Sequence, residues 1–192
     1  MLPIFNKPLI LRAAISGDGW HKGIEKMDGS LTALYLLKNS ERTKFYVGMH
    51  LMALYDKIPA SVIVIYTHQF NKNWGVDISL PSRAFLRYQF CNRHRLSIGN
   101  LLESDQYYYK PEMEGLPETV LFKSTNLKAE LDYEYILNKR FFFIVRGGVN
   151  KTIKSGFYKT NRKGNGDGDP LMEYTQPFTP FFYLGFSYNI FK

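Results

Sequence analysis

The sequence contains one cysteine, Cys91, and no apolar run long enough to form a membrane-spanning helix. A single cysteine excludes an internal disulfide framework. The longest apolar-leaning run without a charge, Ile58 to Asn71, is shorter and more polar than the roughly 20 residues that a transmembrane helix needs. These absences exclude a disulfide-stapled scaffold and a helical membrane protein.

The chain also lacks a glycine-rich phosphate loop, a zinc-ligand spacing and an RNA-binding strand motif. Its formal net charge is +8, but the basic residues are scattered over many segments and form no single stripe. Scattered positive charge favours solubility or attraction to anionic lipid head groups over nucleic acid binding. We therefore predict no cofactor, no metal site and no nucleic acid partner.

The first ten residues have neither the basic start nor the continuous apolar core of a signal peptide. Since the first strand-like segment begins at Pro8, we expect N-terminal sequence to be missing if the protein is exported. We predict that residues 1–192 form one domain.

The most regular stretch of the chain runs from Asn126 to Lys154. Its first arm alternates Leu, Ala and Tyr residues with Lys, Glu and Asp residues, and its second arm alternates Phe and Val with polar residues that include Arg146 and Lys154. Successive side chains of a strand point to opposite faces, so this period of two predicts a hairpin with one apolar and one charged face.

The same alternation recurs along the chain and predicts ten strands of an all-β, antiparallel, up-and-down sheet. Aromatic residues, which favour strands, make up 16% of the chain. The ten segments are Pro8–Ser16, Ser30–Lys38, Thr43–Leu54, Ala60–Phe70, Trp74–Leu80, Arg83–Phe90, Arg95–Leu102, the two arms of the Asn126–Lys154 hairpin, and Phe181–Phe191.

The connections between these segments alternate in length. Short polar turns are expected at Asn39–Arg42, Asn71–Asn73, Cys91–His94 and Asn138–Arg140, and mostly longer loops at Gly17–Gly29, Tyr55–Pro59, Gln106–Thr119 and Asn161–Pro180, with Pro81–Ser82 as the one short member of that set. Short turns at one end and long loops at the other are typical of an outer-membrane β-barrel. We therefore predict a transmembrane barrel of about ten strands, or twelve if N-terminal strands are missing.

In such a barrel the apolar face meets lipid and the charged face lines the interior. Most segments run roughly 8–12 residues, close to the 9–11 that a tilted strand needs to cross a bilayer, and aromatic residues gather near their ends. Charges enclosed in the interior must then balance one another. We predict that a structural network inside the barrel is formed by Glu130, Asp132, Glu134, Arg146, Arg83 and Arg87.

A three-residue loop at Asn138–Arg140 would set Asp132 opposite Arg146, and Tyr133 opposite Val145. A two-residue loop would set Asp132 against Val145 and mix the two faces. We therefore predict the odd loop and an Asp132–Arg146 contact.

From Asn73 onward, several features recur together: Trp74 opens a strand, Leu80–Pro81 ends it, Tyr88 lies in the next strand, and Leu96 and Gly99 precede the Tyr107 region. In these features the chain resembles a family of uncharacterised outer-membrane β-barrel proteins of Gram-negative, Bacteroidetes-like bacteria. The final strand, with Phe186, Tyr188 and Phe191, looks like the aromatic C-terminal signal that the barrel-assembly machinery reads, although Lys192 follows it. The resemblance implies an outer-membrane location, membrane lipid and the assembly machinery as partners, and no catalytic residues.

Three functions stay open from the sequence. The first is a non-enzymatic outer-membrane barrel acting in envelope structure, surface binding or narrow conduction. The second is a soluble, lipocalin-like barrel that binds an apolar ligand. The third is a membrane-barrel hydrolase, which would bring His50 or His68 to an acid and a serine, or use the acidic row of Glu130, Asp132 and Glu134.

Overall fold

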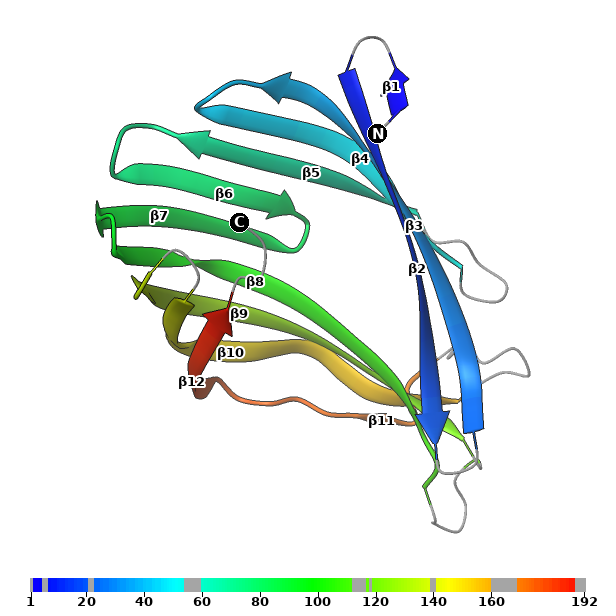
Figure 1. Ribbon diagram of the computed structural model, residues 1–192. Helices are drawn as coiled ribbons and strands as arrows, with labels where there is room; N and C mark the ends of the chain where they lie inside the picture. The colour runs from blue at the N-terminus through cyan, green and yellow to red at the C-terminus, as the bar shows by residue number, and fades with distance from the viewer. Residues whose placement is uncertain are drawn as a thin grey trace.

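The computed structural model describes residues 2–4, 7–20, 23–53, 60–111, 117, 119–138, 141–159 and 169–188. Its strands form one antiparallel sheet in which each strand pairs with the next along the chain, except that the last long strand pairs with β10 (Figure 1). Within these ranges there is no helix that is long and apolar enough to cross a membrane.

Within the described residues, the sheet has ten long strands and two short ones. The strands are β1 (Leu2–Ile4), β2 (Lys7–Trp20), β3 (Gly23–Asn39), β4 (Thr43–Ala53), β5 (Ala60–Gln69), β6 (Trp74–Leu80), β7 (Arg83–Cys91), β8 (His94–Tyr109), β9 (Val120–Ile136), β10 (Phe141–Lys159), β11 (Met172–Glu173) and β12 (Thr179–Tyr188). The ten predicted segments correspond to the long strands, so the all-β, antiparallel, up-and-down architecture is confirmed.

Several strands are longer than the sequence indicates. The prediction of a loop at Gly17–Gly29 is wrong, because β2 and β3 stay paired up to Trp20, which lies opposite Gly23. The predicted loop Gln106–Thr119 is likewise too long, since β8 continues to Tyr109. Backbone hydrogen bonds hold these extensions together, and they need no alternation of side chains.

A β-bulge explains why the period of two fails near the end of the central hairpin. The register of β9 and β10 shifts between Thr152 and Lys154, after which the ladder continues to Lys159. An extra residue in one strand moves the following side chains to the other face. Lys154, expected on the face of Arg146, therefore lies opposite Thr125 on the other face.

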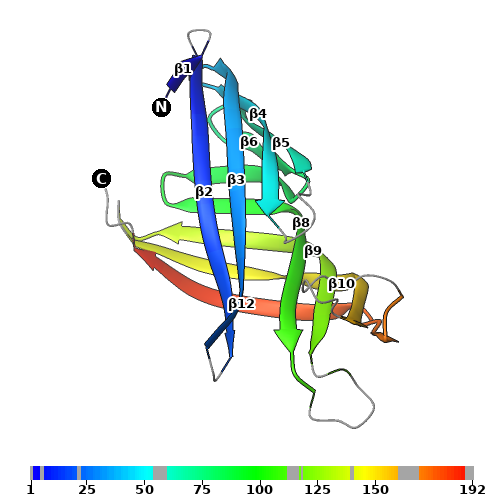
Figure 2. The same ribbon diagram turned by 90° about the vertical axis from the view of Figure 1, so that its right-hand side faces the viewer.

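The sheet is strongly curved but is not closed into a barrel. Among the described residues no pairing joins β12 to β1 or β2, and Figure 1 shows these edges apart. In Figure 2, the strand direction turns from vertical in β2 to nearly horizontal in β12, so the sheet curls as well as twists. The closed barrel expected from the sequence is thus observed only as an open, curved sheet.

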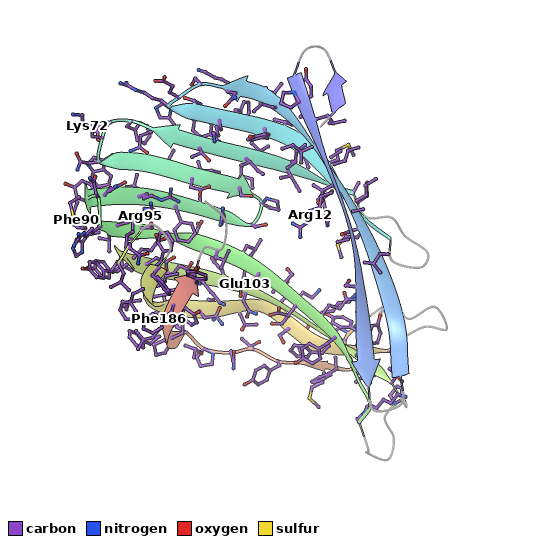
Figure 3. The ribbon with its side chains drawn as sticks, in the orientation of Figure 1. Arg12, Lys72, Phe90, Arg95, Glu103 and Phe186 are labelled. Carbon is purple, nitrogen blue, oxygen red and sulfur yellow. The ribbon has the colours of Figure 1, made fainter. Side chains whose placement is uncertain are left out.

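The two faces of this sheet have opposite character. Large apolar side chains on one face are exposed, including Leu131 at 46%, Ile98 at 58% and Leu184 at 56% of their surface. On the other face, Glu130 and Asp132 are only 5% and 8% exposed. Figure 3 shows Arg12 and Glu103 on this second face, which is the concave one.

The short connections β3–β4, β5–β6, β7–β8 and β9–β10 lie together at one end of the sheet, on the left of Figure 1. Their backbones form tight turns, in which Ser40 and Thr43 bond each other and Leu137 N–H donates to Phe141 O over 3.0 Å. Of the predicted odd loop, Lys139 and Arg140 lie outside the described residues. The register that this loop implies is confirmed, with Tyr133 opposite Val145.

Candidate functional site

The concave face holds a pocket of about 280 Å³ that brings the predicted charges together. We call it the charged pocket. It is lined by Asp77, Arg83, Phe85, Arg87, Ser97, Leu101, Glu130, Asp132, Glu134 and Arg146. All six residues of the predicted network are in this set, and they come from β7, β9 and β10.

Arg146 and Asp132 form the closest ion pair of the pocket. Arg146 Nε lies 2.8 Å from Asp132 Oδ1 and 3.8 Å from Glu130 Oε1. The residues Asp132 and Arg146 are directly opposed across β9 and β10, as the sequence predicts. The guanidinium also lies 5.7 Å from the ring centre of Tyr183 on β12, so three strands hold it in place.

Glycines leave room for the most deeply placed carboxylate. Glu130 lies opposite Gly99 on β8 and opposite Gly148 on β10. A Cβ atom at Gly148 would collide with the carbonyl oxygen of Ala129, and one at Gly99 with that of Ala84. Glycine is therefore required at both positions for the strands to approach this closely at the bottom of the pocket.

Two charged residues of the cluster were missed from the sequence. Asp77 on β6 lies 3.2 Å from the guanidinium of Arg87 and 3.5 Å from that of Arg83. Arg95 on β8 lies 2.9 Å from Glu134 Oε2. Asp77 alternates with the apolar residues Val76 and Ile78 of β6, but the sequence pattern gives no partner for Asp77 or for Arg95.

Among the described residues, the charges of the cluster balance. Four arginines face four carboxylates: Arg83, Arg87, Arg95 and Arg146 against Asp77, Glu130, Asp132 and Glu134. One further ion pair lies beside them, in which Lys128 Nζ is 2.5 Å from Glu103 Oε2. A balanced cluster stabilises buried charges without excess charge of either sign. This arrangement suits a structural network or a weak site for small ions better than a site for a strongly charged ligand.

Two nitrogens in the cluster have no partner among the residues that the structure describes. Arg87 Nε and Arg95 Nε are buried and make no hydrogen bond within the described part of the chain. Buried polar groups are usually satisfied, and a bound water molecule is the usual partner of an N–H group that no protein atom satisfies.

The three described histidines make their contacts outside this cluster. His50 lies 2.8 Å from Thr32 Oγ1 and His68 2.8 Å from Thr43 Oγ1, whereas His94 lies 2.6 Å from the hydroxyl of Tyr133. His21 lies outside the described residues. Over the ranges that the structure describes, no three His, Cys, Asp or Glu residues are grouped to hold a metal ion.

The apolar face carries a band of aromatic rings near the end with the short turns. Ring pairs there include Trp74 with Tyr88 at 4.6 Å and Phe141 with Tyr188 at 4.7 Å between centroids. The ring centroid of Phe186 lies 5.1 Å from that of Phe143. Phe186 is 78% exposed, and Figure 3 shows it near this end. Of the predicted C-terminal signal, Phe191 lies outside the described residues.

Comparison with known proteins gives no relative. No family model matches the chain, and neither a curated protein nor a solved structure is detectably similar to it. The resemblance to uncharacterised outer-membrane barrels therefore stays a prediction, and the argument for a function depends on the geometry of this sheet alone.

Proposed function

We propose that this protein is a non-enzymatic β-barrel of the bacterial outer membrane. The supporting observation is the inverted polarity of the sheet. Glu130 and Asp132 are buried on the concave face, while Leu131, between them in sequence, is exposed on the convex face. A water-soluble sheet buries its apolar face, whereas a membrane barrel turns that face to lipid.

The exposed apolar surface is extensive. Beyond Leu131, it includes Val62, Leu86, Ile98, Val149, Phe182, Leu184 and Phe186, each at least 40% exposed. Soluble monomers rarely carry a continuous apolar surface of this extent. The aromatic band at one end of the strands matches the interfacial girdle of membrane barrels.

The soluble, lipocalin-like alternative needs an apolar concave face to hold its ligand. Here that face carries the charged pocket, whose lining has eight ion-pairing or polar residues from Asp77 to Arg146 and only two apolar ones, Phe85 and Leu101. The hydrolase alternative needs a histidine beside a carboxylate, and the described histidines bond hydroxyl groups. Neither alternative is favoured by an observation of its own.

In the membrane, we propose that β12 pairs with β2 to close the barrel. A line drawn straight across the paired strands links Thr179, Asn150, Lys128, Leu101, Arg83, Ser79, Ile65, Tyr46 and Leu36. Because the neighbouring Tyr35 pairs with Leu9, this line reaches β2 at Pro8.

Barrel geometry then restricts the closing register. After one circuit of a barrel, the line across the strands returns to its starting strand offset by a number of residues called the stagger. With about 3.3 Å per residue and about 4.8 Å between strands, ten strands tilted by about 35–45° need a stagger of about 10–14 residues. The stagger must be even, since an odd value would mix the two faces. A stagger of about 12, counted along β2 from Pro8, sets Thr179 opposite Trp20 and Leu184 opposite Ile15.

In this register, β12 and β1 pair with different residues along the same edge of β2. The residues of β12 would pair with Leu11–Trp20, while β1 already pairs with Lys7–Leu9. β2 and β12 run antiparallel in the resulting order, so no strand has to be reversed.

The interior of a barrel of this size is narrow, and side chains largely fill it. The charged pocket and the adjoining Arg95 cross it with four arginines and four carboxylates. The proposed role is therefore in envelope structure or surface binding, with conduction limited to water and small ions. Membrane lipid and the barrel-assembly machinery are the proposed partners.

Fractionation tests the proposal. We expect the chain, expressed in a Gram-negative host behind an export signal, to enter the outer-membrane fraction and to be extracted only by detergent. Folded protein should migrate differently on a gel before and after boiling. Recovery as a folded protein in the aqueous fraction without detergent would contradict the membrane barrel and favour the soluble alternative.

A further inference from the structure

A second hollow lies on the concave face, further along β8, β9 and β10 toward the end with the long connections. We call it the polar hollow. Its volume is about 380 Å³, within the range of small-molecule sites. It is lined by Asp105, Gln106, Tyr107, Phe122, Ser124, Asn126, Asn150, Thr152, Ser155, Tyr174 and Gln176.

The lining differs in chemistry from that of the charged pocket. Amide and hydroxyl side chains dominate it, and Asp105 is the one charged residue among the lining residues. Aromatic rings complete it, with Tyr107 and Phe122 at 4.7 Å between their centroids. Neutral hydrogen-bonding groups beside ring faces recognise a ligand that is neutral, rich in hydroxyl groups and apolar on one side.

The walls of the hollow are held by their own contacts. Thr152 Oγ1 donates to Asn126 Oδ1 over 2.8 Å and lies 3.4 Å from Gln176 Oε1. Tyr174 N–H donates to Ser155 O over 3.0 Å, which holds the chain after β11 against β10. The lining groups are thus positioned before any ligand binds.

Two polar atoms in the hollow have no partner in the described part of the chain. Asn150 Oδ1 and Ser155 Oγ are buried and make no hydrogen bond within the described residues. Ser155 is only 4% exposed, and both side chains line the hollow. An acceptor and a hydroxyl left open in this way are placed to bond the hydroxyl groups of a ligand.

We propose that the polar hollow binds a neutral saccharide. Sugar hydroxyls both donate and accept, as the amide and hydroxyl groups here require, and the C–H face of a sugar ring can stack on Tyr174 or Tyr107. An anionic ligand would find no Lys or Arg among the described lining residues, and a purely apolar one would leave the amides unsatisfied. The site's access from outside the cell rests on the proposed membrane barrel, because the long connections face outward in such barrels.

Titration calorimetry on the folded, detergent-solubilised chain tests this site. The probes are maltotriose and N,N′-diacetylchitobiose as neutral sugars, and digalacturonate as an anionic one. We expect saturable binding of at least one neutral sugar in the micromolar to millimolar range. Asn150→Leu and Tyr174→Ala should each weaken it roughly tenfold or more, since each removes a hydrogen bond or a stacking ring.

Asn100→Leu is the matched control, because Asn100 is an exposed residue on the convex face of β8. It should leave sugar affinity unchanged, and heat-modifiable migration should show that every variant folds. The proposal is overturned if folded protein binds neither neutral sugar, if it prefers digalacturonate, or if the hollow variants bind like the control. If the protein is recovered in the aqueous fraction and still binds a neutral sugar, the proposed membrane barrel is contradicted and the proposed sugar site is supported.

Discussion

Arg146 Nε donates to Asp132 Oδ1 over 2.8 Å across directly opposed positions of β10 and β9. The same guanidinium approaches Glu130, so one cation serves two buried carboxylates. This relationship ties the register of the central hairpin to the charge balance of the concave face.

Removing that cation should destabilise the fold. We expect Arg146→Leu to lower the free energy of unfolding by about 1–3 kcal/mol, because Glu130 and Asp132 lose their shared partner while Arg146 itself is partly exposed. The temperature at which heat-modifiable migration is lost measures the effect. Lys72→Leu, at an exposed turn, is the control. Equal heat resistance of Arg146→Leu and Lys72→Leu would show that the contact contributes nothing.

A charge placed on the convex face should hinder membrane insertion. Ile98 is 58% exposed on β8 and lies opposite Leu86, near the middle of β7, and an arginine at the bilayer midplane costs about 2–4 kcal/mol. Ile98→Arg should therefore lower stability in lipid vesicles, measured by urea titration. Phe90→Arg, at the end of β7 where Figure 3 labels Phe90, should cost less because the penalty falls near the interface. A harmless Ile98→Arg would indicate that this face meets water.

Closure of the sheet can be tested with paired cysteines. In a Cys91→Ser background, we expect Ile15→Cys and Leu184→Cys to form an intramolecular disulfide in membranes, because directly opposed strand residues lie at disulfide distance. A shift on a non-reducing gel reports the bond. The control pair Ala14→Cys and Leu184→Cys has its side chains on opposite faces. Crosslinking of the control, or of neither pair, would disprove the proposed register.

Adjacent glycines of β10 should respond differently to alanine. A Cβ atom at Gly148 would collide with the backbone of Ala129, whereas one at Gly147 would meet nothing nearer than 3.8 Å. We expect Gly148→Ala to destabilise the fold by about 1–3 kcal/mol and Gly147→Ala to leave it nearly unchanged. Chemical denaturation of the two variants in parallel measures the difference. Similar stabilities would show that close strand approach beside Glu130 is not required.

Much of the architecture could be predicted from the pattern of residues. Strict alternation located the ten long strands, and it gave the register that places Asp132 opposite Arg146. Alternation could not reveal the extension of β2 and β3 beyond Gly17, where backbone pairing continues without a patterned face. It also failed beyond Thr152, because a bulge reverses the faces and a bulge has no fixed signature in the sequence.

The candidate sites were predicted less completely. Asp77 and Arg95 lie on the same face as the predicted network, but partners on neighbouring strands depend on several successive registers, each set by its own turn. The polar hollow was missed altogether. Its residues come from β8, β9, β10 and the chain beside β11, and their common chemistry appears only when those segments are adjacent.

The sequence by itself determined that each strand has one apolar and one charged face, because side chains alternate on any extended backbone. Only the tertiary structure decided which face is concave and encloses its charges. Curvature follows from strand twist, from bulges and from glycines such as Gly99 and Gly148 that let strands approach closely. These properties of many strands acting together bring Asp77, Glu130 and Arg146 into one pocket from three separate segments of the chain.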